Sequence, residues 1–177
     1  PVGIKDIIDT HDQPSENGTE ADRGRMPAVD ATVVARLRRA GAVILGKTVT
    51  TECACGASRN TRNPHDLLRT PGGSSSGSAA AVAANMVPLA LGTQTAGSVI
   101  RPAAFCGVWG MMPSLGTIPC TGVLKLSETL DHIGTFANSP QDLALAIDAI
   151  SGDDGIDPYT QGQAATRLSA ALKERLV

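Results

Sequence analysis

The stretch from Pro71 to Arg101 constrains the fold more than any other part of the chain, because its two loops consist almost entirely of small residues. The first loop reads GGSSSGS over residues 72–78, and the second reads GTQTAGS over residues 92–98. Glycine lets neighbouring backbone approach closely, so amides and hydroxyls can crowd around a ligand. Serines this dense between glycines favour nucleophilic chemistry or an anion cradle. A flexible Gly/Ser linker is disfavoured, since an ordered apolar segment follows each loop.

The composition is that of one globular domain, and its 177 residues are enough to bury a core. The net charge is −2 and no basic run is present, which argues against nucleic acid or an anionic membrane surface as a partner. The longest apolar run falls far short of a membrane span. Aromatic residues make up only 2% of the chain, so the core must be built from Ala, Val, Leu and Ile.

The four cysteines, Cys53, Cys55, Cys106 and Cys120, do not have the spacing of a zinc site. We interpret them as reduced and mostly buried thiols, and the chain shows no secretory signal. The sequence therefore predicts a cytoplasmic protein without a bound metal.

Hydrophobic periodicity and turn residues predict alternating strands and helices, hence an α/β fold with a mixed, largely buried sheet flanked by helices. The expected strands lie at the start of residues 2–9, at 42–45, 87–91 and 108–112, and as short pieces within 113–124. The expected helices are one that Asp30 caps and Gly41 ends, then 76–85, 98–105, one that Ser139 caps, and a weak one over 164–176.

The small-residue stretch resembles the signature of the amidase signature family. The family pattern reads roughly GGSS-G-S-A-A-A-V-A, then L-G-T-D-T-G-G-S, then an Arg, a Pro and an apolar helix. This chain has GGSSSGSAAAVAA and LGTQTAGS, followed by Arg101, Pro102 and AAFCGVWG, so the match extends from Gly72 to Gly110. Near the start, VGIKD resembles the family segment that carries a catalytic lysine.

The resemblance implies a serine hydrolase with a Ser-cis-Ser-Lys triad made of Ser98 as nucleophile, Ser74 as the bridging cis residue and Lys5 as base. It implies hydrolysis of a carboxylic amide to carboxylate and ammonia through a Ser98 acyl-enzyme, without a cofactor. Such chemistry needs a stabilised oxyanion, which the backbone amides of Thr95, Ala96, Gly97 and Ser98 would supply. Burial would lower the pKa of Lys5 enough for it to act as a base.

Three positions depart from the family pattern. Gln94 replaces a usual Asp, and Ala96 replaces a usual Gly, which would restrict the loop if that position needs a positive φ. Arg101 comes three residues after Ser98, a placement similar to malonamidase-like members. Because Arg suits bidentate binding of carboxylates, we expect Arg101 to hold the carboxylate of a small half-amide. The alternative is a purely structural arginine.

Two other motifs are present and disfavoured. The segment from Gly41 to Thr48 fits the phosphate-binding loop G-x-x-x-x-G-K-[ST], but its interior is an expected strand and no helix follows. Gly73-x-Ser75-x-Gly77 fits a nucleophile elbow, but no strand precedes it. The only histidine downstream of it is His132, in a segment that resembles a structural part of the family.

The chain begins without Met and is shorter than the family, so we expect residues 1–177 to be part of a single amidase signature domain with N- and C-terminal portions missing. The expected partner is a small-molecule amide, and a homodimer is a further option. One alternative is the amidotransferase subunit that releases ammonia for Glu-tRNA(Gln) or Asp-tRNA(Asn). Another is a truncated relic without activity.

Overall fold

The computed structural model describes residues 1–56 and 60–172, and its centre is a five-stranded mixed sheet. The strand order is β2-β1-β3-β5-β4. β1 runs parallel to both of its neighbours, whereas β5 is antiparallel to β3 and β4. The strands are β1 (Val2–Lys5), β2 (Ile44–Thr48), β3 (Leu89–Gln94), β4 (Trp109–Met111) and β5 (His132–Ala137).

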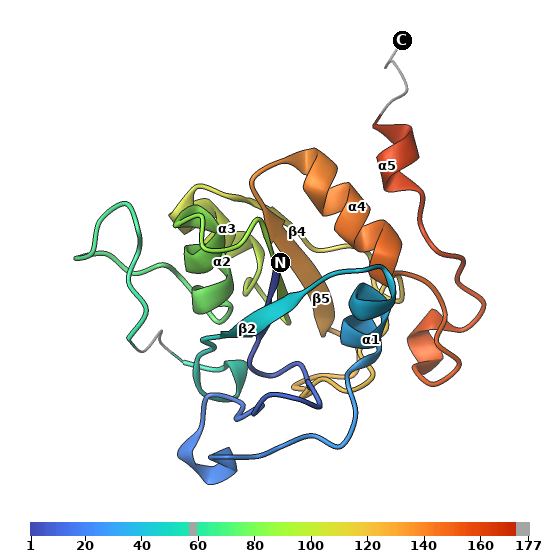
Figure 1. Ribbon diagram of the computed structural model, residues 1–177, viewed down its shortest axis with the longest axis horizontal. Coiled ribbons are helices and arrows are strands. Elements are labelled where there is room, and N and C mark those ends of the chain that lie inside the picture. The colour runs from blue at the N-terminus through green and yellow to red at the C-terminus, as the bar shows by residue number, and fades with distance from the viewer. Residues whose placement is uncertain (57–59, 173–177) are drawn as a thin grey trace.

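Helices cover both faces of this sheet (Figure 1). α2 (Ser76–Ala83) and α3 (Ile100–Cys106) lie on one face, and α1 (Thr32–Arg39) and α4 (Pro140–Ile150) lie on the other. The short helix α5 (Leu168–Ala171) follows near the C-terminus. The described residues also form the 3-10 turns η1 (Glu20–Asp22), η2 (Glu52–Ala54) and η3 (Pro158–Thr160). The predicted α/β class, a mixed sheet flanked by helices, is confirmed.

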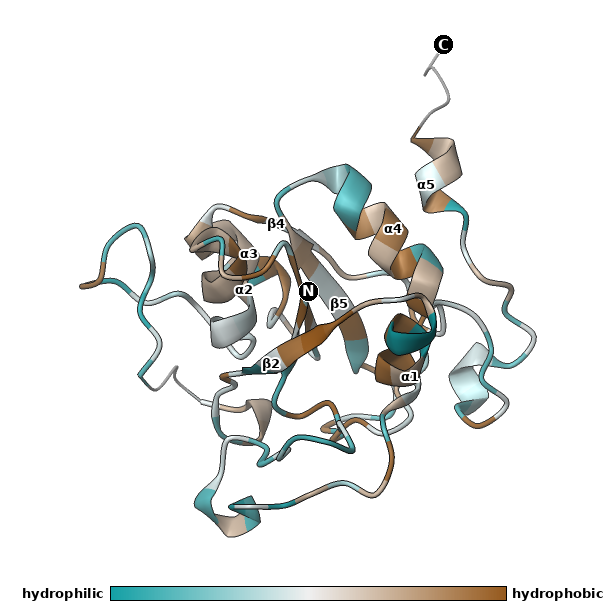
Figure 2. Ribbon diagram, in the orientation of Figure 1, coloured by the Kyte–Doolittle hydropathy of each residue, from teal (hydrophilic) through white to brown (hydrophobic). Residues whose placement is uncertain are grey.

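The strands supply two hydrophobic cores because successive side chains point to opposite faces. Leu91 and Ile133 pack with residues of α1 and α4, whereas Ala90 and Phe136 pack with residues of α2 and α3. Figure 2 shows both hydrophobic and hydrophilic colours on α1 and α4, as expected of helices with one face on the sheet and the other in solvent. With few aromatic residues, the chain fills these cores with aliphatic side chains, as the composition predicts.

Small side chains bring α2 close to the end of β2. The N–H of Gly77 donates to the carbonyl oxygen of Val49 at 2.9 Å. A Cβ at Gly77 would lie 2.3 Å from the backbone nitrogen of Val49. The GGSSSGS loop therefore enters its helix against the backbone that follows β2, and only glycine fits at this contact.

Some strands differ from the sequence prediction. The strand expected at 42–45 begins two residues later as β2, and the one expected at 87–91 extends to Gln94 as β3. Residues 113–124 form no strand and contribute only an isolated bridge between Val123 and Ile8. β5 was not predicted as a strand. In each case pairing with a distant partner decides where the strand lies.

Two helix starts also differ. Asp30 does not cap α1, because Ala31 occupies the N-cap and the Asp30 carboxylate instead accepts from the Arg38 Nε and the His11 N–H. The helix expected to begin at Ser98 begins at Ile100. Ser139 caps α4 as predicted, accepting from the Asp142 N–H. Of the expected helix 164–176, residues 164–167 are not helical, α5 covers Leu168–Ala171, and 173–176 lie outside the described residues. In the part of the chain that the structure covers, no helix has the length and apolar character needed to cross a membrane.

Replacing Gly77 by Ala is expected to lower the free energy of unfolding by about 1–3 kcal/mol, the usual cost of overpacking a tight contact. Helix propensity alone would favour Ala by about 1 kcal/mol, so a net loss reports the contact with Val49. Chemical denaturation measures the effect. Gly46→Ala is the matched control, because nothing lies within 4 Å of a Cβ there. A Gly77→Ala protein as stable as the parent would contradict this packing.

Candidate active site

The predicted site residues gather where two neighbouring parallel strands end. β1 ends at Lys5, and β3, which pairs with it, ends at Gln94. Since the carboxyl ends of parallel strands meet at one edge of a sheet, the loop after β3 follows directly beside Lys5. The Ser75 N–H donates to the Ser98 carbonyl oxygen at 3.3 Å. This bond ties the two small-residue loops together.

Lys5 is fully buried and is held by two hydroxyl groups. Its Nζ lies 2.7 Å from the Ser74 Oγ and 2.7 Å from the Thr93 Oγ1, with a longer contact of 3.4 Å to the Thr93 carbonyl oxygen. Burial lowers the pKa of Lys5 to about 7, and the negative charge of Asp131 acts in the opposite direction. A substantial fraction of the amine is therefore neutral near pH 7.

The peptide bond between Gly73 and Ser74 is cis, as the resemblance implies. The Ser74 carbonyl oxygen accepts from the Thr51 N–H at 3.1 Å. Arg101 donates from Nε and Nη2 to the Gly73 carbonyl oxygen, at 3.1 and 2.9 Å. Arg101 thus has a structural contact, and its guanidinium also lines an open groove of about 550 Å³ together with Arg62.

The loop over residues 95–98 presents unused backbone donors. Among the described residues, none accepts a hydrogen bond from the amide nitrogens of 95–98. Ala96 is not among the residues with positive φ, so its Cβ imposes no backbone strain on the loop. The Ser98 hydroxyl makes no hydrogen bond with any residue that the structure describes, and it is not joined to Ser74.

Gln94 explains why the helix starts late. Its Oε1 accepts from the N–H groups of Val99 and Ile100 at 2.8 and 3.0 Å. Its Nε2 lies 2.9 Å from the Met112 Sδ. Gln94 therefore caps α3 from outside and leaves Ser98 in the turn before it. The sequence marked Gln94 only as a departure from the family pattern.

Two site residues were missed by the sequence analysis. Thr93 binds Lys5 through its hydroxyl, and Asp131 accepts from the Thr95 hydroxyl. A cavity of about 10 Å³ lies beside Ser74, and Thr93, Thr95 and Asp131 all line it. Thr93 belongs to the LGTQTAGS motif, so its position in that motif could have marked it as a candidate site residue. Asp131 had none beyond its position in a segment that resembles a structural part of the family.

The two rival motifs do not have the geometry that they need. Lys47 lies inside β2 and donates to the Ile8 carbonyl oxygen and to the Ser15 Oγ, and no α-helix follows it directly. The Ser75 hydroxyl is buried and donates to the Thr93 carbonyl oxygen. His132 Nδ1 lies 2.7 Å from the carbonyl oxygen of Leu130. A phosphate loop and a nucleophile elbow are therefore both disfavoured by the structure.

The described residues contain one group able to hold a metal ion, formed by His11, Asp12 and Asp30. Arg38 already pairs with both carboxylates, and none of the three residues lines the cavity beside Ser74. The four cysteines are free thiols. Cys106 and Cys120 are buried, and burial raises the pKa values of their thiols to about 11 and about 12. In contrast to the expectation of mostly buried thiols, Cys55 is exposed and Cys53 is half-buried.

Comparison with known proteins identifies relatives over nearly the whole chain. The chain is 46% identical over 162 residues to a subunit of glutamyl-tRNA(Gln) amidotransferase from Thermus thermophilus, and the match covers 88% of this chain and 34% of that protein. It superimposes on the peptide amidase from Stenotrophomonas maltophilia with a TM-score of 0.90 and 39% identity, over 97% of this chain and 38% of that one. For the corresponding glutamyl-tRNA(Gln) amidotransferase subunit from Thermotoga maritima the TM-score is 0.86 at 42% identity, over 90% of this chain and 37% of that one.

The chain thus spans about a third of the length of the relatives it matches. A family model described as Amidase matches residues 1–176. The chain therefore belongs to the amidase family, and it carries the signature of that family between its first small-residue loop and β4.

Proposed function

We propose that this chain carries the catalytic groups of an enzyme that hydrolyses a carboxylic amide to a carboxylate and ammonia. Ser98 is the nucleophile, Lys5 the base and Ser74 the bridge between them. The observation that carries the proposal is the 2.7 Å contact between the fully buried Lys5 Nζ and the Ser74 Oγ. A buried lysine that is held by hydroxyl groups, with a pKa of about 7, is suited to accept a proton from a serine.

In this proposal the neutral Lys5 amine takes the proton of the Ser74 hydroxyl, which takes that of Ser98 as the Ser98 Oγ attacks the amide carbonyl carbon. The negative charge that develops on the carbonyl oxygen is bound by the unused N–H groups of residues 95–98. Lys5 then returns the proton through Ser74 to the leaving nitrogen, and ammonia departs. Water then attacks the acyl-enzyme and restores the Ser98 hydroxyl.

Treatment with a fluorophosphonate serine probe is expected to place an adduct on Ser98. Lys5→Ala should slow this labelling by about 100-fold or more, because general-base catalysis contributes about 10²–10⁴ in rate. Peptide mass spectrometry locates the adduct and its time course gives the rate. Lys47→Ala is the matched control, a second largely buried lysine outside the site, and it should label at the parent rate while the protein is folded. An adduct on Ser75 would contradict the assignment in favour of the elbow motif.

The labelling rate should depend on pH through Lys5. Because the pKa of Lys5 is lowered to about 7 and the neutral amine is the base, the rate should rise about tenfold per pH unit below pH 7 and level off above it. Initial labelling rates from pH 5.5 to 9 measure this profile. The Lys47→Ala protein should keep the same midpoint. A rate that still increases steeply at pH 9 would show that a group of ordinary lysine pKa controls the reaction.

The substrate that we propose is a short half-amide whose free carboxylate binds Arg101. Two guanidinium nitrogens of Arg101 donate to the Gly73 carbonyl oxygen, and the side chain reaches the open groove of about 550 Å³. Arg62 and Arg69 line the same groove, which makes it cationic, although Arg69 pairs with Asp66. A carboxylate on the substrate would therefore be attracted by the positive charge of Arg101, whose guanidinium contacts Gly73, the residue before Ser74.

Arg101→Ala is expected to lower kcat/KM for a short half-amide at least about tenfold more than for its neutral methyl ester, since hydrogen bonds to charged groups contribute about 1.5–3 kcal/mol. Both rates should fall to some extent, because Arg101 also supports Gly73. Ammonia release with the two substrates gives the ratio. Equal losses on both substrates would leave Arg101 with a structural role only.

The identity to a glutamyl-tRNA(Gln) amidotransferase subunit supports a second candidate, in which the ammonia is passed to a partner protein. Ammonia release that is strongly stimulated by partner proteins would favour this candidate. We propose a small-molecule amide as ligand in either case, a cytoplasmic location, and residues 1–177 as part of one amidase domain. A folded protein that the serine probe does not label would favour the non-catalytic relic.

A further inference from the structure

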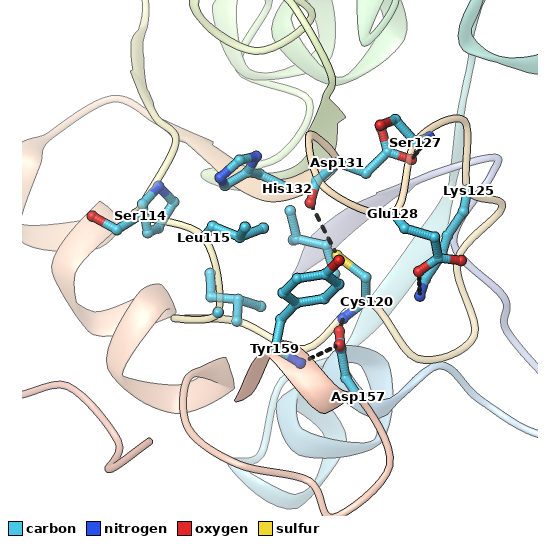
Figure 3. Close-up of a pocket in the computed structure, with 14 residues that line it drawn as sticks. Ser114, Leu115, Cys120, Lys125, Ser127, Glu128, Asp131, His132, Asp157 and Tyr159 are labelled. Atoms are coloured by element: carbon cyan, nitrogen blue, oxygen red, sulfur yellow. Dashed lines mark hydrogen bonds and ion pairs between the residues drawn. The ribbon is translucent and has the colours of Figure 1, made fainter. Parts of the chain in front are cut away.

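Asp131 connects two segments that border the cavity beside Ser74. It comes directly before β5, and its Oδ1 accepts from the Thr95 hydroxyl. Its Oδ2 accepts from the N–H groups of Leu126 and Ser127. Figure 3 shows Asp131 above Cys120, with Ser127 beside it. One carboxylate thus binds the loop after β3 and the loop that precedes β5.

The loop after β3 needs such support because its own amides contribute none. The amide nitrogens of 95–98 have no acceptor among the described residues, so the loop cannot fix its orientation through backbone hydrogen bonds of these groups. Gln94 holds the end that leads into α3, by accepting from Val99 and Ile100. The other end begins at Thr95, and the Thr95 side chain bonds to Asp131.

The other charged groups around Asp131 are occupied elsewhere. Lys125 and Glu128 pair with each other at 2.7 Å, and Asp157 accepts from the N–H groups of Cys120 and Tyr159. These residues line a neighbouring cavity that Asp131 also lines, together with His132. The negative charge of Asp131 also raises the pKa of the buried Lys5 in β1, against the larger effect of burial. Within the described residues, Asp131 is the only carboxylate that bonds to the loop over 95–98.

We propose that Asp131 is a positioning residue that acts through the Thr95 hydroxyl to aim the N–H groups of residues 95–98 at the reacting carbonyl oxygen. This inference rests on the proposed function, because those N–H groups are the proposed oxyanion donors. A hydrogen bond to a carboxylate is about twice as strong as one between neutral groups. It is therefore suited to fixing the Thr95 end of the loop, because the other bonds to the loop, from the Ser75 N–H to the Ser98 carbonyl oxygen and from the Arg101 N–H to the Gly97 carbonyl oxygen, lie at its α3 end. Small misplacements of oxyanion donors lower the rate of the chemical step more than they lower binding.

The test compares four variants by the maximal rate of fluorophosphonate labelling at Ser98 and by the probe concentration that gives half of it. Thr95→Val removes the hydroxyl at nearly constant shape, Thr95→Ser keeps it, Asp131→Asn removes the charge, and Thr95→Val with Asp131→Asn removes both. Asp157→Asn is the matched control, since this carboxylate lines the neighbouring cavity without bonding to the loop. Thermal unfolding confirms that each protein is folded at the temperature used.

We expect Thr95→Val and Asp131→Asn each to lower the maximal rate about 10- to 100-fold with little change in the half-saturating concentration. Thr95→Ser should restore most of the rate. The double variant should be no slower than the slower single variant, because both changes act on the same hydrogen bond between Thr95 and Asp131. The pH midpoint of labelling should stay at the parent value in Thr95→Val, since the base is untouched. Asp157→Asn should label at the parent rate.

Several results would overturn the inference. Parent-like labelling of Thr95→Val would do so, as would multiplying effects in the double variant, a shifted pH midpoint in Thr95→Val, or an equal loss in Asp157→Asn. These outcomes leave the proposed function intact as long as the parent labels at Ser98. A parent protein that is folded and does not label at Ser98 would overturn the proposed function, and this inference with it.

Discussion

The buried amine of Lys5 is the constraint on which the rest of the site depends. A charged ammonium group removed from water costs several kcal/mol unless it is paired, and a buried lysine usually lowers its pKa instead. Here the two nearest partners of the amine are the hydroxyl groups of Ser74 and Thr93, which carry no charge and can donate to a neutral amine or accept from a charged one. Among the described residues, the only charge that opposes the effect of burial is that of Asp131. The result is a group poised near neutrality, as the proposed base must be.

Burying Lys5 in this way requires small residues in the surrounding elements, so that their backbones can approach the lysine closely. β1 is an interior strand between β2 and β3, so the hydroxyl partners must come from a neighbouring strand end and from a loop pressed against it. A Cβ at Gly92 would lie 2.6 Å from the Ser75 Oγ, and Ser75 bonds to the backbone of Thr93 in both directions. The small residues therefore allow two loops to approach one lysine closely, which explains why both loops contain so many of them.

The sequence predicted what depends on local pattern. Periodicity and capping chemistry predicted the fold class, α2 and the cap of α4 by Ser139, and the family resemblance implied the cis bond before Ser74. Features that depend on distant contacts were missed. β3 continues through Gly92 because β5 pairs with it there, and β5 itself has no strong alternation to identify it. Asp30 looks like a helix cap, but the guanidinium of Arg38 competes for its carboxylate.

Gln94 shows how a departure from the family pattern fits this electrostatic balance. An aspartate at this position would add a negative charge directly after Thr93, which binds Lys5, and would favour the charged amine. The amide of Gln94 still accepts from two N–H groups at the start of α3, and its own N–H group contacts the Met112 sulfur instead of remaining unpaired. A neutral cap at one end of the loop over residues 95–98 and the Asp131 carboxylate at the other end hold this loop in place. Because Gln94 brings no charge, Asp131 is the only acidic group in the described part of the chain that acts on the lysine.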